Sequence, residues 1–349
     1  MRRGATAILA LVSCLLAGCD MRDEFDDSPF NNFEACWRIL DEDYCFFDYK
    51  QIDWGAIHDK YAPMALEAAG ERDLFRVLSL MTQELQDGHV NVVAKYFYST
   101  YDGWFQPYPS NFDWNVIQNY YQAGKRAGDH DEIRYAHLAG GQVGYIYYGS
   151  FNESILETDL NIIFDAFKTC RGLIVDVREN GGGSLTNSDH LASRFLDRKT
   201  LCGYIRHKTG KGHQDFSDPY PLYLEPSRGD LWLKPVIVIT NIRCFSAANN
   251  FVSKMGVLPN VRTLGGSTGG GSGFPFTSEL PNGWRVRFST SPILDVNGEH
   301  TEFGIDPDIA VSLSDEDVER GQDTLIEAAV SLLLSTQSEA VPGAAPVVK

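Results

Sequence analysis

The sequence predicts an α/β fold with a largely parallel sheet, preceded by a helical N-terminal region. Between residues 33 and 86, apolar residues recur at three- and four-residue spacing, which is typical of amphipathic helices. From residue 143 onward, short β-branched runs alternate with helical segments, which indicates strands joined by helices. The 349 residues, 43% of them hydrophobic, are enough for one large domain or two medium ones.

Each element is expected where the periodicity is clearest. Helices are predicted over residues 33–47, 53–68, 71–86, 160–170, 185–196, 246–255 and 322–335. Strands are predicted over residues 143–151, 172–178, 202–210 and 236–240. Residues 96–135 are rich in aromatic residues and have no clear period, so they either line a cleft or pack between domains.

The domain organisation follows from these changes of pattern. It comprises a signal segment (1–19), an acidic tether (20–29), a helical N-terminal domain (30–95), an aromatic connecting segment (96–135), an α/β domain (136–335) and a flexible tail (336–349).

The first residues have the pattern of a secretory signal. Arg2 and Arg3 precede an apolar run, and the run ends in Leu16-Ala17-Gly18-Cys19, which resembles a bacterial lipobox. That resemblance implies cleavage before Cys19 and a lipid on its thiol; the alternatives are an ordinary signal peptide or a short anchor helix. We therefore expect an extracytoplasmic protein, lipid-anchored in the bacterial cell envelope, on the periplasmic face or the outer-membrane surface.

The charge of the chain limits its partners. Removal of the signal takes the formal net charge from −17 to −19, which argues against nucleic acid and against electrostatic attraction to anionic lipid. The five remaining cysteines form no CxxC pair, so no zinc pattern or disulfide framework is indicated. We interpret them as buried free thiols, with a Cys36–Cys45 bridge as the alternative.

Ser246 lies where a predicted strand, VIVIT, passes into a predicted helix. Serine at this position commonly caps the helix by accepting a hydrogen bond from a backbone N–H group. The alternative is a nucleophile whose oxyanion is held by the free amides of the helix N-terminus.

Three further segments carry candidate functional groups. Arg178-Glu179-Asn180-Gly181-Gly182-Gly183 follows a strand and is either an anion hole of backbone amides or a flexible turn. His89 follows a helix and is either structural or a base. Glu302, with His300 nearby, is either an exposed carboxylate or the partner of a histidine.

The segment Gly265-Gly266-Ser267-Thr268-Gly269 matches a G-x-S-x-G nucleophile motif. That motif requires a helix directly after the serine, and the glycine-rich sequence GGGSGFPF does not favour one. We interpret the segment as a glycine-rich loop near the site.

Together these segments resemble peptidase family S41, the tail-specific or C-terminal-processing proteases and the tricorn core protease, with retinoid-binding proteins as relatives. The resemblance extends from about residue 33 to residue 333 and is carried by LQDGHVNV, VGYIYYGSF, GLIVDVRENGGG, KPVIVITNIRCFSAANNF, TLGGSTGGGSG, LPNGW and EFGIDPDI. It implies a crotonase-like (ClpP/crotonase) α/β core as the catalytic domain, a helical N-terminal region, and no metal or cofactor.

The resemblance also implies roles for individual residues. The family serine falls on Ser246, and the lysine of the Ser–Lys dyad is replaced by Gly271. The tricorn-like branch uses histidine and glutamate, which fall on His89 and Glu302. A serine hydroxyl needs such a base near neutral pH, with the carboxylate acting on the imidazole directly or through one hydroxyl or water.

The backbone N–H groups of Ala247 and of Gly181 or Gly182 would complete the site as an oxyanion hole. The expected function is that of a serine-type endopeptidase acting on peptides or proteins. The alternative is a catalytically inactive envelope protein of the same fold that binds peptides or apolar ligands. The stretch between Val93 and Val143 is too short for the PDZ domain that many members carry, so the sequence leaves a preference for C-terminal tails open.

Overall fold

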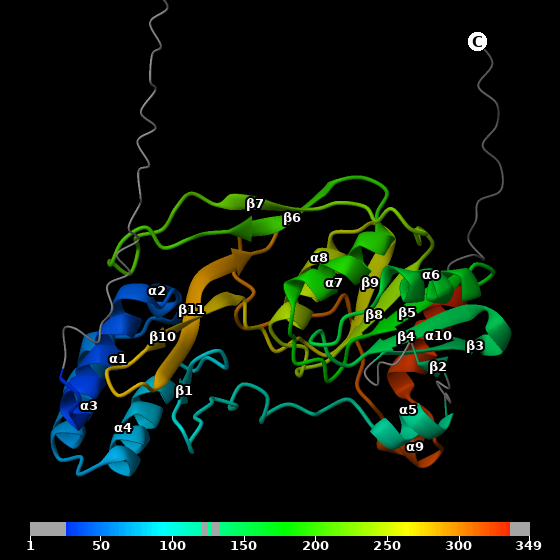
Figure 1. Ribbon diagram of the computed structural model, residues 1–349. Coiled ribbons are helices and arrows are strands. Elements are labelled where there is room, and N and C mark those ends of the chain that lie inside the picture. The colour runs from blue at the N-terminus through cyan, green and yellow to red at the C-terminus, as the bar shows by residue number, and fades with distance from the viewer. Residues whose placement is uncertain (1–25, 121–124, 127–132, 336–349) are drawn as a thin grey trace, which may run out of the picture.

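A computed structural model describes residues 26–120, 125–126 and 133–335, which form two lobes (Figure 1). A lobe of helices with a long β-hairpin lies on the left of this view, and an α/β lobe lies on the right. The antiparallel strands β6 (Thr200–Ile205) and β7 (Tyr220–Leu224) run across the top between them. Within the described part of the chain, no helix is long and apolar enough to span a membrane.

The predicted signal with Cys19, most of the acidic tether and the tail 336–349 lie outside the described residues. The tether is predicted to reach residue 29, but helix α1 (Pro29–Asp43) already begins there. Ser28 caps this helix, because its Oγ accepts a hydrogen bond from the Asn31 N–H group at 3.2 Å. The boundary of the tether therefore lies earlier than predicted.

Helices α1, α2 (Phe47–Lys50), α3 (Trp54–Leu66) and α4 (Glu71–Gln83) form the helical lobe. The predicted helix over residues 33–47 is wrong at its end, because the chain turns at Tyr44 and starts α2 at Phe47. Helix α4 ends three residues before the predicted position. The turn that follows brings Gly88 so close to the Phe245 ring that a Cβ atom there would lie 2.9 Å from it.

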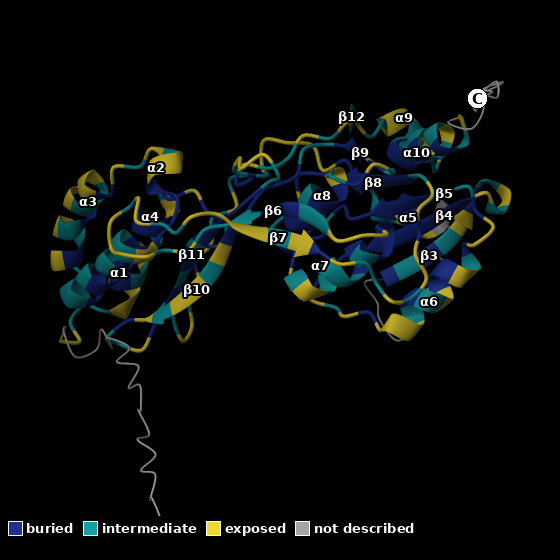
Figure 2. Ribbon diagram, turned by 90° about the horizontal axis from the view of Figure 1, so that it is seen from above, coloured by how far each residue is buried: buried dark blue, intermediate teal, exposed yellow. Residues whose placement is uncertain are grey.

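The α/β lobe contains a seven-stranded sheet in which the five strands of one side are parallel. The strand order is β12 (Ile309–Ala310), β9 (Val261–Gly265), β8 (Val236–Thr240), β5 (Gly172–Asp176), β4 (Val143–Tyr148), β3 (Ile133–Leu138) and β2 (Lys125–Arg126). The central strands are buried on both faces, which explains their unbroken β-branched runs (Figure 2). The predicted fold class is confirmed.

Helices cover both faces of this sheet. Residues of α6 (Glu157–Ala166), α7 (Leu185–Ala192) and α8 (Ala247–Gly256) belong to the core on one face. Residues of α5 (Trp114–Tyr120) and α10 (Thr324–Ser335) belong to the core on the other, next to the short helix α9 (Asp315–Glu319). Helix α5 falls in the connecting segment, where no helix is predicted.

A hairpin of β10 (Gly273–Glu279) and β11 (Arg285–Leu294) changes the predicted domain boundaries. Although it lies inside the predicted α/β domain 136–335, its residues Trp284, Val286 and Phe288 belong to the core of the helical lobe. Strand β11 pairs with β1 (Asn91–Val93) at one end and with β6 at the other. The helical lobe is therefore built from two separate parts of the chain.

The described cysteines are all free and buried, namely Cys36, Cys45, Cys170, Cys202 and Cys244. The alternative of a Cys36–Cys45 bridge is therefore wrong. Burial raises the pKa of the Cys36 thiol to about 12, and it raises the pKa of the other four as well. These thiols are protonated at neutral pH and are poor nucleophiles.

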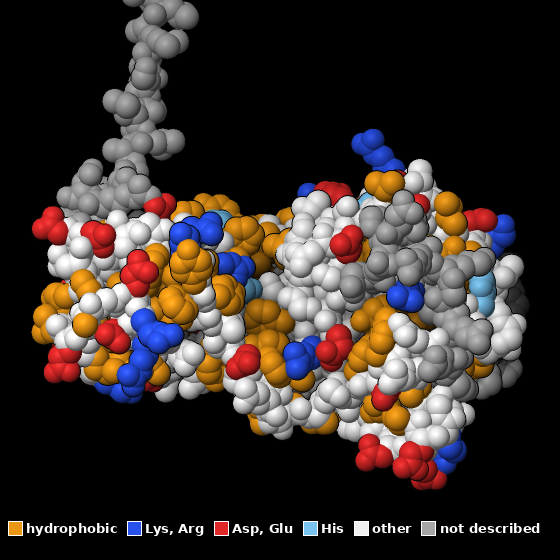
Figure 3. Space-filling view, turned by 60° about the horizontal axis from the view of Figure 1, so that its bottom comes forward, with side chains coloured by type: hydrophobic (Ala, Val, Ile, Leu, Met, Phe, Trp, Pro, Cys, Tyr) orange, Lys and Arg blue, Asp and Glu red, His pale blue; other side chains and the backbone are white. Residues whose placement is uncertain are grey.

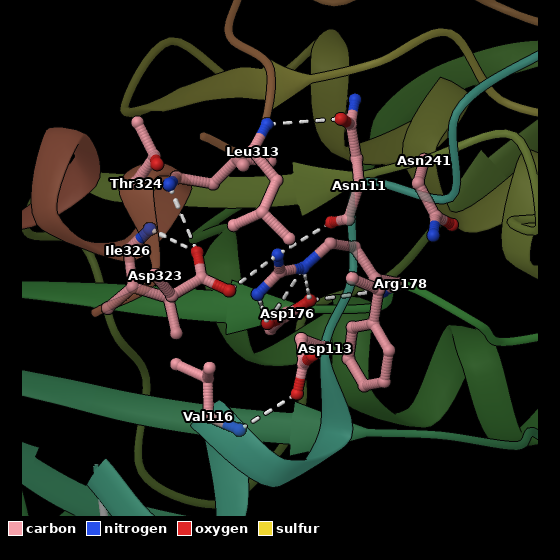
Figure 4. A network of polar contacts seen from close by, with 12 residues as sticks. Asn111, Asp113, Val116, Asp176, Arg178, Asn241, Leu313, Asp323, Thr324 and Ile326 are labelled. Carbon is pink, nitrogen blue, oxygen red and sulfur yellow. Dashed lines mark hydrogen bonds and ion pairs between the residues drawn. The ribbon is translucent and has the colours of Figure 1, made fainter. Parts of the chain in front are cut away.

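A buried ion cluster fixes the end of β5, just before the glycine triplet (Figure 4). The Arg178 guanidinium, which is fully buried, contacts Asp176 at 2.6 Å and Asp323 at 2.9 Å. It also donates to the Asn111 carbonyl at 2.9 Å. Asp323 in turn accepts from the Leu325 N–H group at the start of α10. One side chain thus joins the sheet, the connecting segment and the last helix.

We predict that Arg178→Met destabilises the protein by about 3–5 kcal/mol, because two carboxylates would stay buried without their cation. Urea unfolding followed by circular dichroism measures the change. The control is Arg320→Met: Arg320 is exposed and pairs with Glu316 within one helical turn, so its loss should cost at most about 1 kcal/mol. Equal effects of the two substitutions would contradict the prediction.

Candidate active site

Ser246 stands at the N-terminus of α8 in an unusual backbone conformation, with φ 58° and ψ −118°. Non-glycine residues rarely adopt positive φ, and such strain tends to persist where the surroundings impose it. Here the Ser246 N–H group donates to the Gly270 carbonyl at 2.8 Å. The side chain forms no capping bond, so the interpretation of Ser246 as an ordinary N-cap is wrong.

The Ser246 hydroxyl instead lies 2.9 Å from Nε2 of His89. His89 comes from the other lobe, two residues before the start of β1, and only 3% of its surface is exposed. Its backbone N–H group donates to Asp87 at 2.7 Å, and its ring packs on Phe245 with the centroids 4.9 Å apart. The fold thus brings together two residues that are 157 positions apart in the chain.

Burial controls the protonation of His89. Its pKa is lowered to about 4, chiefly by desolvation and in part by the nearby charges of Arg287 and Lys50, while the charge of Asp87 opposes the shift. The imidazole is therefore neutral at pH 7. With the proton on Nδ1, its Nε2 atom can accept the proton of the Ser246 hydroxyl.

Glu302 is buried, but it does not bond to His89. One of its carboxylate oxygens lies 2.9 Å from Nζ of Lys50, and the other accepts from the Ser272 N–H group at 2.8 Å. The Nδ1 atom of His89 has no hydrogen-bond partner among the described residues. A direct bond between the predicted carboxylate and the histidine is thus absent.

Lys50 connects Glu302 to a second carboxylate, Asp87. Its Nζ atom lies 3.8 Å from Asp87, whose carboxylate also accepts from the hydroxyls of Tyr44 and Ser289, both at 3.0 Å. The side chains of Lys50, Asp87 and Glu302 are at most 4% exposed. We refer to these three residues as the Lys50 cluster.

The pKa values of the two carboxylates in the Lys50 cluster are shifted in opposite directions. Burial raises the pKa of Glu302 and the charge of Asp87 raises it further, with Lys50 opposing both. Burial would also raise the pKa of Asp87, but the charge of Lys50 and the hydrogen bonds from His89 and Ser289 hold it below its ordinary value. Asp87 therefore keeps its negative charge close to His89 as the pH falls.

The glycine triplet and the glycine-rich loop lie against Ser246. A Cβ atom on Gly182 would meet the Phe245 carbonyl at 2.7 Å and the Ser246 Cβ at 2.8 Å, so only glycine fits there. At Gly271, where φ is 76°, a Cβ atom would lie 2.4 Å from the Phe245 ring. A side chain at the position of the dyad lysine would therefore collide with Phe245.

Ser267, the serine of the G-x-S-x-G segment, lies in a loop and not before a helix. Its hydroxyl donates to Asp306 at 2.6 Å, on the exposed surface. The interpretation of this segment as a glycine-rich loop near the site is confirmed, because its continuation supplies the Gly270 carbonyl that holds Ser246.

Two cavities flank the serine and histidine. A cavity of about 350 Å³ is lined by Ser246 together with residues of α8 and the β10–β11 hairpin, among them Arg287. A second cavity, of about 320 Å³, is lined by Trp104, Tyr108, Phe245 and Glu302.

The aromatic connecting segment lines a cavity and also packs against the core. Trp104 stacks on Phe245 at 4.8 Å, whereas Phe112 and Trp114 pack against Tyr147 of the sheet. The segment runs along the underside between the lobes, where Figure 3 shows hydrophobic side chains at the surface. The expectation that the segment lines a cleft holds for Trp104 and Tyr108, whereas Phe112 and Trp114 pack on the α/β lobe and not between the lobes.

Sequence reasoning missed Lys50, Asp87 and Arg287. Asp87 lies two residues before His89, so its proximity was open to inference. Lys50 and Arg287 belong to a short helix and a hairpin, and no pattern in the sequence relates either to the site. No group of three or more histidine, cysteine or acidic side chains suited to a metal ion occurs within residues 26–120, 125–126 and 133–335.

Comparison with known proteins places the chain in a family. Residues 142–311 match the profile of peptidase family S41, and residues 25–83 match that of the tricorn protease C1 domain. A crystal structure of a candidate peptidase from Parabacteroides merdae is 49% identical, covers 91% of this chain and 100% of its own, and superposes with a TM-score of 0.84. The chain belongs to peptidase family S41.

More distant members of S41 are similar over less of the chain or in fold alone. The carboxy-terminal processing protease CtpA of Bacillus subtilis is 24% identical over 187 residues, which are 53% of this chain and 38% of that protein. The structure of mature CPAF is 14% identical, covers 90% of this chain and 98% of its own, and has a TM-score of 0.66. The chain spans less than two fifths of the length of the curated relatives that it matches.

We predict that Lys50→Met destabilises this S41 protein by about 3–5 kcal/mol, because Asp87 and Glu302 would share a buried site without a cation. Guanidinium unfolding measures the loss. The matched control is Lys211→Met, since Lys211 is 72% exposed and pairs with Glu42, and its loss should cost about 1 kcal/mol or less. A stable Lys50→Met protein would show that the two carboxylates are neutralised in another way.

Proposed function

We propose that this S41 protein is a serine-type endopeptidase that hydrolyses peptide bonds through an acyl-enzyme on Ser246, with His89 as the general base. One observation carries the proposal: the Ser246 hydroxyl forms no helix cap and lies 2.9 Å from Nε2 of a neutral, buried histidine. A serine and a base within hydrogen-bonding distance are the pair that nucleophilic catalysis requires.

In the first step, His89 Nε2 takes the hydroxyl proton while Ser246 Oγ attacks the carbonyl carbon of the scissile bond. The tetrahedral intermediate then collapses as His89 gives this proton to the leaving amine, which leaves the acyl group on Oγ. Water attacks the ester in the same way. His89 takes one proton from the water and returns it to Oγ as the acid product leaves.

The oxyanion is held by the backbone N–H groups of Ala247 and Gly181 in this proposal. Ala247 is the first residue of α8, where backbone N–H groups lack partners within the helix. Between the two glycines, Gly181 is favoured, because the Gly182 N–H group already donates to Asn180 at 2.9 Å. Loss of one such donor costs about 3–4 kcal/mol of transition-state stabilisation in comparable enzymes.

Glu302 has a positioning role in this mechanism. It acts through its ion pair with Lys50 and does not bond to His89. It forms the shorter ion pair with Lys50, at 2.9 Å against 3.8 Å for Asp87. Asp87 is thereby less neutralised, and its charge stabilises the imidazolium that forms during the reaction. Glu302 also holds the backbone of Ser272, in the loop next to the nucleophile.

The test is labelling with a fluorophosphonate, which reacts with activated serines, followed by mass spectrometry. We expect the label on Ser246, no label in Ser246→Ala, and labelling at least about 100-fold slower in His89→Ala. Ser267→Ala and His190→Ala are matched controls, since Ser267 bonds to Asp306 and His190 to Glu157 at the surface. Absence of label on folded wild-type protein would favour the alternative, a peptide- or ligand-binding member without catalysis.

The pH dependence of labelling tests the state of His89. Protonation removes the base, so the rate must fall as the pH falls through the pKa of His89. We expect the loss that reports on His89 to have its midpoint near pH 4, since burial lowers the pKa of His89 to about 4. Circular dichroism at each pH separates this loss from unfolding. A midpoint near 6.5, the ordinary value for histidine, would contradict a buried base.

A further inference from the structure

The cavity beside Ser246 has the size and chemistry of a side-chain subsite. Its volume of about 350 Å³ lies within the range of ligand pockets, and its walls include the apolar residues Leu185, Phe274 and Ile293. Arg287 is the charged residue in its lining. A substrate that places its carbonyl at Ser246 must put a neighbouring residue into this cavity, because Ser246 and Arg287 line the same space.

Arg287 has no carboxylate partner among the described residues. It is half-buried on β11, and its contacts from Nη1 are long: 3.5 Å to the His89 carbonyl and 3.4 Å to Asn91 Oδ1. Burial lowers its pKa, yet a guanidinium in a protein remains charged at neutral pH. Most of its hydrogen-bonding capacity, five N–H donors in a planar fork, is not used by those two contacts.

Asp87, the carboxylate whose charge acts on Arg287, already has other partners. Asp87 is bound by Lys50, Tyr44, Ser289 and the His89 backbone, so Arg287 does not serve as its counter-ion. Another polar side chain of the same cavity has an atom without a partner: Oδ1 of Asn250, a residue only 9% exposed, has no hydrogen-bond partner in the described part of the chain. A guanidinium with unused donors and an amide oxygen without a partner, in one cavity, indicate a polar ligand.

We propose that this cavity is a substrate subsite that selects a carboxylate in the residue adjacent to the scissile bond, through the Arg287 guanidinium. The inference rests on the proposed function and specifies its substrate class. A guanidinium binds a carboxylate through two parallel N–H···O bonds, which gives both strength and orientation. The carboxylate has two sources, an Asp or Glu side chain within a chain or the free C-terminus of a peptide.

The net charge of −17 works against the binding of an acidic ligand, and a local cation offsets that effect. A protein with this excess of acidic residues repels anionic peptides at long range, and salt screens that repulsion over about 10 Å. Selection of a carboxylate must then come from a contact inside the cavity.

Binding is measured on the Ser246→Ala protein, so that the result does not depend on turnover. Random peptide pools carry one fixed residue and differ in a single group: Glu with an amidated C-terminus, Gln with an amidated C-terminus, or Gln with a free C-terminal carboxylate. We expect one of the two carboxylate pools to bind about tenfold or more tightly than the neutral pool. The pool that binds more tightly identifies the source of the carboxylate.

The same measurement on Arg287→Gln should reduce the preference to near onefold, with Arg287→Lys retaining part of it. Arg285→Gln is the matched control: Arg285 lies two residues away on β11, is exposed and does not line the cavity, so the preference should persist. Equal binding of all three pools, or an equal loss for the two Gln variants, would overturn the inference.

Cleavage of the same pools by the wild-type protein separates this inference from the proposed function. Hydrolysis that depends on Ser246 but shows equal kcat/KM for acidic and neutral pools would refute the proposed carboxylate subsite. It would still support the proposed peptidase function. A carboxylate preference in binding, without labelling or hydrolysis in the wild-type protein, would support the subsite and refute the catalytic proposal.

Discussion

The contact between Ser246 and His89 is the constraint on which the rest of the site depends. Ser246 stands at the N-terminus of α8, after the buried strand β8 of the α/β lobe, and His89 precedes a strand of the helical lobe. The 2.9 Å bond between them exists only if the two lobes keep their relative position to within a few tenths of an ångström. Strand β11, which pairs with β1 in the helical lobe and with β6 between the lobes, and the ion pair between Lys50 and Glu302 hold that position.

Two buried ion clusters support this contact. Arg178 fixes the backbone that leads into the glycine triplet, and Lys50 fixes the loops that carry Glu302 and Asp87. Burying such charges costs free energy that their mutual attraction offsets only in good geometry. Their presence next to the serine and histidine is consistent with a protein in which the position of a few backbone groups matters more than maximal stability.

The order of elements was accessible from periodicity, because strands buried on both faces and amphipathic helices impose recognisable patterns. The helical lobe, the parallel sheet and the junction at Ser246 were all predicted in this way. The packing of the β10–β11 hairpin against the helical lobe was not predicted. Trp284, Val286 and Phe288 alternate with polar residues at and after the start of β11, and this pattern would suit either lobe. Alternation indicates that a strand has a buried face, but not which core covers it.

The sequence by itself determined which residue types stand at the ends of which elements, and hence the candidates Ser246, His89 and Glu302. Only the tertiary structure decided what each of them contacts. It turned the Ser246 hydroxyl from its helix to the histidine, directed Glu302 to Lys50, and left Arg287 lining a cavity with no carboxylate partner among the described residues. The physical reason is that hydrogen bonds and ion pairs act over a few ångströms, and the fold alone sets distances on that scale between residues far apart in the chain.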